Sequence, residues 1–93
     1  MQWLTTRRLG YAVQVASDAG SAFRTVNAGR SAHPGDVERL GREMLAHWLS
    51  DAAMRGEAPA LYDDHGNALL RVVIRDADDD TVLAVVRPVR QPA

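Results

Sequence analysis

The alternation of apolar and polar residues changes along the chain, and these changes divide it into predicted elements. Residues 11–17 alternate strictly, with the larger apolar side chains on one face, which is typical of a half-buried β-strand. A glycine-containing turn at 17–21 separates this segment from a second predicted strand at 22–28. Two such strands joined by a short turn predict an antiparallel hairpin. The preceding residues 1–8 either extend the first strand or form a frayed edge.

The period becomes helical after Asp36 and predicts one long amphipathic helix. Pro34 and Asp36 stand where a helix begins, and Gly56 suits the position just past its end. At 100° per residue the apolar residues share one side, and Trp48, near the centre of that side, is the predicted anchor in the core. The apolar side consists of Val37, Leu40, Gly41, Met44, Leu45, Trp48 and Ala52.

The chain after the helix predicts further strands separated by aspartate-containing turns. A short strand is expected near residues 60–62 and a longer one at 68–75. The last strand is expected at 81–89, where Pro88 indicates the edge of a sheet.

Together these elements predict an α+β fold. The order is β-β-α-β-β, a small antiparallel sheet with one amphipathic helix packed across one face, because this arrangement buries the apolar side of the helix most simply. A chain of 93 residues without a linker predicts a single compact domain over residues 1–93.

Composition excludes several classes of protein. An apolar content of 46% argues against disorder. Without cysteine there is no disulfide framework, no thiol nucleophile and no cysteine-based zinc site. No signal-peptide pattern and no apolar run long enough to span a bilayer is present, so we expect a cytoplasmic protein.

The charged residues are nearly balanced, with a formal net charge of −1. This balance argues against a general nucleic-acid binder, which would be strongly basic. All eleven cationic residues are arginines. Either the genome is rich in G and C, or an interface uses the planar, bidentate guanidinium group.

The stretch DADDD at 76–80 is the most metal-like motif in the chain. Asp76, Asp78 and Asp80 match the first three ligand positions of a calcium loop, but the sixth position holds Thr81 and the twelfth holds Arg87. A calcium loop requires glycine and glutamate at these positions. Because aspartate is also favoured in turns, we interpret the motif as a turn and predict no metal site.

Two further groups of polar residues receive structural interpretations. The segment 63–67, which contains Asp63, Asp64 and His65, is typical of a hairpin turn. His47 lies one helical turn from Glu43 and from Asp51, which fits an exposed residue among charged neighbours. Since no catalytic or nucleotide-binding motif is present either, we predict that the protein is not an enzyme and has no cofactor.

The last two predicted strands are apolar on both faces, although one helix covers only one face of a sheet. Aliphatic residues mixed with arginine on an exposed face resemble a protein interface. The alternative is that residues 1–8, with Trp3 and Leu4, fold over this face. The predicted interface consists of Arg71, Val73, Arg75, Val82, Val86 and Arg87.

The stretch LYDDHGNALLRVVI, after an alanine- and leucine-rich helix, is similar to the end of small bacterial domains that finish with an acidic, glycine-containing hairpin. The predicted order of elements also looks like that of several inhibitors from phages and mobile elements, including some anti-CRISPR proteins. This resemblance of architecture implies an inhibitor that acts by binding another protein.

Three functions follow from these patterns. The first is a non-catalytic protein-binding module, an inhibitor or adaptor, whose partner is another protein or a second copy in a homodimer. The second is a nucleic-acid-binding regulator or antitoxin that uses Arg71, Arg75, Arg87 and Arg90, although aromatic residues are not interleaved with these arginines as stacking requires. A hydrolase or metal protein that uses His47, Asp51 and the aspartate turns ranks last.

Overall fold

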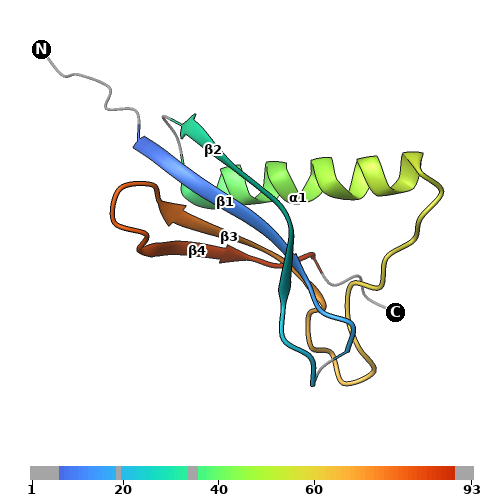
Figure 1. Cartoon of the computed structure of the whole chain (residues 1–93). Helices are drawn as coiled ribbons and strands as arrows, with labels where there is room; N and C mark the ends of the chain where they lie inside the picture. Colours follow the sequence, from blue (N-terminus) through green and yellow to red (C-terminus); the bar gives the residue numbers. More distant parts are fainter. Residues whose placement is uncertain (1–6, 19, 34–35, 90–93) are drawn as a thin grey trace, which may run out of the picture.

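A computed structural model describes residues 7–18, 20–33 and 36–89 and shows an antiparallel sheet with one helix on it (Figure 1). The elements in chain order are β1 (Arg7–Val15), β2 (Arg24–His33), α1 (Val37–Met54), β3 (Leu70–Asp76) and β4 (Val82–Val86). The four strands lie in the order β2-β1-β3-β4, so the two hairpins meet through the antiparallel pair β1–β3. The predicted α+β fold with β-β-α-β-β order is confirmed.

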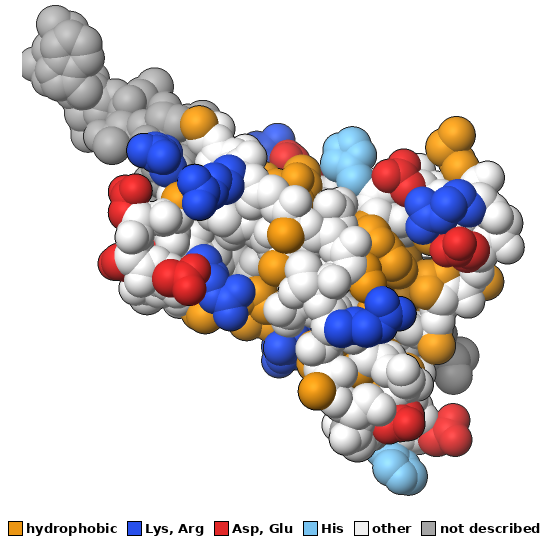
Figure 2. Space-filling view, in the orientation of Figure 1, with side chains coloured by type: hydrophobic (Ala, Val, Ile, Leu, Met, Phe, Trp, Pro, Cys, Tyr) orange, Lys and Arg blue, Asp and Glu red, His pale blue; other side chains and the backbone are white. Residues whose placement is uncertain are grey.

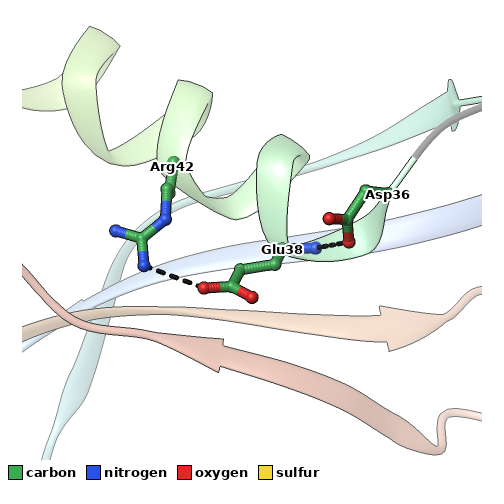
Figure 3. Close-up of polar contacts among 3 residues, drawn as sticks. All are labelled: Asp36, Glu38 and Arg42. Atoms are coloured by element: carbon green, nitrogen blue, oxygen red, sulfur yellow. Dashed lines mark hydrogen bonds and ion pairs between the residues drawn. The ribbon is translucent and has the colours of Figure 1, made fainter.

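Local chemistry fixes both ends of α1. The Asp36 side chain accepts a hydrogen bond from the Glu38 backbone N–H at 3.0 Å and so caps the first turn. Glu38 in turn pairs with Arg42 at 2.8 Å, one helical turn further on (Figure 3). Gly56 follows the last turn with φ of +77°, a left-handed conformation that favours glycine. The predicted start and end of the helix are therefore confirmed.

The core lies between α1 and one face of the sheet, chiefly over β3 and β4. Buried side chains from β1, α1, β3 and β4 form it: Leu9, Val13, Leu40, Leu45, Leu70, Val72, Ile74 and Val86. Trp48 packs against this cluster but is only partly buried, so the helix is anchored by its leucines rather than by Trp48 as predicted. A ring of this size is seldom fully enclosed.

Several strand boundaries differ from the prediction. β1 begins at Arg7, ahead of the alternating segment at 11–17, and β2 continues to His33 rather than ending at residue 28, because the two strands pair along their whole length. The short strand predicted near 60–62 is reduced to a single bridge between Tyr62 and Ala68. β4 ends at Val86, before Arg87 and Pro88.

Candidate interaction surface

The sheet surface that faces away from α1 is called the open face here. Side chains directly opposite each other in an antiparallel pair share a face, so the strand register assigns its members. Successive residues point to opposite sides, and the residues that alternate with the core in β1, β3 and β4 therefore form this face together with their partners in β2. They are Arg8, Gly10, Ala12, Gln14, Thr25, Ala28, Arg30, Ala32, Arg71, Val73, Arg75, Val82 and Val85.

The predicted interface is partly wrong about its valines. Val86 pairs with Val72 and packs in the core under α1, with 3% of its surface exposed. Val73 belongs to the open face, but it too is only 3% exposed, between Ala12 and Val85. The exposed valines of this face are Val82 at 49% and Val85 at 37%.

A β-bulge explains this error. Ile74 pairs with Ala84, whereas the next residue, Arg75, pairs with Val82, so Leu83 is the extra residue in β4. The bulge breaks the strict alternation expected for this strand. Val82 and Val85 consequently share the open face, and Val86 is turned to the core.

The arginines of the predicted interface occupy different environments. Arg71 lies on the open face, donates from Nε to Gln14 Oε1 at 2.8 Å, and stacks over the Phe23 ring at 3.9 Å from the ring centre. Arg75 lies on the same face in the row of Gly10. Arg87 is exposed but follows the end of β4. Arg90 and the alternative cover by residues 1–6, including Trp3 and Leu4, lie outside the described residues.

The charge of the sheet differs from that of the whole chain. Every charged residue in the four strands is an arginine except Asp76, the last residue of β3. The other carboxylates belong to α1 and to the connecting segments. In Figure 2 basic side chains gather over the end of the sheet where β1 begins, beside acidic side chains of the β3–β4 turn. Near-neutrality of the chain thus conceals a basic sheet surface, a signal that the net charge could not give.

Arg8 and Arg30 belong to this surface and were not predicted. Among the residues that the structure describes, ion pairs join side chains of α1 and of the segment just after it, not these arginines. Arg30 lies opposite Gly10 on β2, and Arg8 lies near it beside a second small hollow. The glycine inside β1 and the arginines of β1 and β2 are visible in the sequence, but only the strand register brings them together.

The aspartate-rich segments are turns, as predicted. Asp76 Oδ1 accepts hydrogen bonds from the backbone N–H groups of Asp78 at 2.8 Å and Asp79 at 3.3 Å, and Asp80 adopts a φ of +64°. Over the described ranges, no three histidine or acidic side chains are grouped so as to hold a metal ion.

The second turn is held by Asp63. Its Oδ1 accepts from the backbone N–H of Asn67 at 2.7 Å and from that of His65 at 2.9 Å. The hydrogen bond from the Asn67 backbone lowers the pKa of the Asp63 carboxyl below its ordinary value, with smaller contributions from the Asn67 amide and the His65 backbone. The shifted pKa therefore has a structural cause. His47 is exposed on α1, as predicted.

Calcium at millimolar concentration is expected to leave the melting temperature unchanged. Asp76 already accepts the turn's own N–H groups, and the positions that would complete a calcium site hold Thr81 and Arg87. Thermal unfolding in calcium chloride should be compared with unfolding in sodium chloride of the same ionic strength. A rise of several degrees specific to calcium would contradict this prediction, because an ion bound only to the native state must stabilise it.

No helix in the described part of the chain combines the length and the apolarity that crossing a bilayer requires. Comparison with protein-family models, with curated proteins and with solved structures finds no match.

Proposed function

We propose that the protein is a non-catalytic binding module, an inhibitor or adaptor, whose open face binds an acidic surface of another protein. The observation that carries this proposal is the juxtaposition of exposed Val82 and Val85 with arginines that no described carboxylate neutralises. Aliphatic side chains left in water lose the free energy of burial. Arginine is enriched at protein interfaces, where it forms paired hydrogen bonds to carboxylates.

The charge of the open face favours a different protein over a second copy. A two-fold contact uses the same patch on both subunits. Such a contact through this face would bring the arginines of one copy against those of the other, and like charges at an interface are strongly unfavourable. The homodimer remains an untested prediction, and acidic partners fit this face better.

Nucleic acid is the second candidate, favoured by one observation: the strands contribute arginines to the open face and no carboxylate, because Asp76 lies opposite the core residue Leu9. Two features weigh against it. The Phe23 ring near this face is already covered by Arg71, whereas single-stranded nucleic acid needs free aromatic surfaces. The aspartates at 76–80 would also repel a phosphate backbone that runs across the end of the sheet, and more strongly than they repel a single carboxylate of a protein, because the backbone carries a negative charge at every nucleotide.

Replacing both Val82 and Val85 with aspartate is expected to abolish partner binding while the fold is retained. Both side chains are exposed, so the change costs little burial, but it adds negative charge where an acidic partner would lie. Affinity capture from the source cells should be compared for the wild type, this double variant, and Met54→Asp. Met54 is 86% exposed at the end of α1. Met54→Asp therefore also replaces an exposed apolar side chain with aspartate, but at a position outside the open face.

A protein retained by the wild type and by Met54→Asp, but lost from the double variant, would support the proposal. Its binding should also weaken with added salt, because exposed charges are screened. If no captured protein distinguishes the double variant from the control, the open face is not a protein interface. A salt-sensitive shift of DNA or RNA in place of protein capture would establish the second candidate instead.

A further inference from the structure

We infer that Arg30, Gly10 and Arg75 form a notch on the open face that binds one carboxylate of the partner, an aspartate or glutamate side chain. This inference rests on the proposed function and specifies the chemistry that the open face recognises. It is carried by the strand register, by the space above Gly10 and by the charges around that space.

The register places the two arginines on either side of a residue that has no side chain. Gly10 in β1 is directly opposite Arg30 in β2 and directly opposite Arg75 in β3. The two arginine backbones are thus separated by two strand spacings, about 10 Å. Arginine side chains are long enough to reach a group held above the glycine from both sides, and each presents a planar fork of donors that matches a carboxylate.

A hollow of about 170 Å³ lies above Gly10, with Arg30, Arg75 and Asp80 among its lining residues. Pockets for drug-sized molecules begin at roughly 300 Å³. The space therefore suits a single side-chain group rather than a cofactor or a nucleotide. Figure 2 shows the basic side chains that gather over this end of the sheet.

Among the residues that the structure describes, none requires glycine at position 10. A Cβ atom placed there would meet no atom closer than the Gly29 carbonyl oxygen, at 4.0 Å, and Gly10 is not among the glycines with positive φ. Gly29 differs, because the Tyr11 ring lies directly against it. Glycine inside a strand weakens the strand and often marks the close approach of a ligand. The missing side chain of Gly10 keeps the notch open.

The charges around the notch favour the binding of an anion, but with limited affinity. Neither Arg30 nor Arg75 forms an ion pair with a described carboxylate. Asp76 also lines the hollow, but its Oδ1 accepts from backbone N–H groups of its own turn. Asp80 places a negative charge at the rim and should weaken the attraction without cancelling it. Val82, the next residue in the same row, adds an exposed aliphatic contact beside the notch.

The notch can be tested with a capped peptide of alternating glutamate and valine, followed by NMR on the intact protein. The Gly10 amide and the Nε–H groups of Arg30 and Arg75 should shift on titration, and the matching glutamine–valine peptide should produce no such shift. Arg30→Gln and Arg75→Gln should each weaken binding by about tenfold, the effect expected from losing a charged hydrogen bond. Gly10→Leu should abolish binding by filling the hollow.

Two further variants make the test specific. Arg71→Gln is the matched control, because this arginine shares the open face but is held by Gln14 and Phe23; binding should change by less than about twofold, as for charges acting only through solvent. Asp80→Asn should tighten binding by removing the opposing charge, and asparagine tolerates the positive φ of this position. A variant that is partly unfolded would bind the peptide less tightly, so unfolding does not explain a gain in affinity.

An equal effect of Arg71→Gln and Arg30→Gln would overturn the inference, since it would show general attraction to the face rather than a notch. Equal binding of the glutamine peptide would do the same, as would inorganic phosphate binding more tightly than the glutamate peptide. If the glutamate peptide fails while Val82 and Val85 variants still lose a captured protein, the notch is wrong and the proposed function stands. If the peptide binds at Gly10 but no partner depends on the open face, the proposed function is wrong and the notch stands alone.

Discussion

Replacing Ile74 with alanine is expected to lower the free energy of unfolding by about 2–5 kcal/mol. Ile74 is 0% exposed and lies in β3, which has a strand on each side and α1 above it. Shortening its side chain removes buried apolar contacts and leaves a cavity. Because β3 is held by a strand on each side, the structure cannot move to fill that cavity. Because small domains are stable by only about 5–15 kcal/mol in total, the loss should shift chemical unfolding to clearly lower denaturant concentration.

Val85→Ala provides the control for this prediction. Val85 lies in the same hairpin but is 37% exposed on the open face, so its shortening should change stability by less than about 1 kcal/mol. Urea unfolding followed by circular dichroism measures both variants under identical conditions. Equal stabilities for the two variants would mean that α1 does not cover the face of the sheet to which Ile74 belongs.

The parts of this fold that sequence predicted well are those determined within a few residues. The Asp36 cap, the Gly56 end and the aspartate turns each depend on side chains that bond to their own neighbouring backbone. The apolar side of α1 follows from its 3.6-residue period in the same way. Such features do not depend on segments that are distant in the sequence, so the sequence alone suffices to predict them.

The errors arise where distant segments decide the structure. The first residues of β1 and the last residues of β2 show no useful alternation, and they are strands because they pair with each other. The bulge in β4 exists only relative to its partner β3. One extra residue there exchanged Val86 for Val85 on the open face, and no periodicity within β4 reveals it.

The candidate site shows the same division. Arg71 and Arg75 were predicted because they alternate with aliphatic residues within a single strand. Arg30 was missed because its position beside Gly10 and Arg75 depends on pairing across three strands. The interior glycine and the density of arginine were visible, but only the register makes them one site.

Gly41→Leu should destabilise the protein by about 3 kcal/mol, although leucine forms helices better than glycine. Gly41 is buried where α1 crosses β4. A Cβ atom at this position would lie 2.5 Å from Val86 Cγ2 and 3.1 Å from Val86 Cβ. Valine is stiff about χ1, so the contact is relieved mainly by moving the helix away from the sheet. Thermal and urea unfolding of the purified variant measure the loss.

Gly41→Ala, combined with Val86→Ala, tests whether this contact is the cause. Alanine at 41 alone gains helix propensity of about 1 kcal/mol but meets Val86, and Val86→Ala alone leaves a cavity in the core. In the double variant, the methyl group added at position 41 occupies the space that the shorter side chain at position 86 leaves. We expect the double variant to be more stable than the sum of the single changes predicts, by at least about 1 kcal/mol. Additive effects within about 0.5 kcal/mol, the usual result for residues that do not touch, would show that α1 does not approach β4 at Gly41.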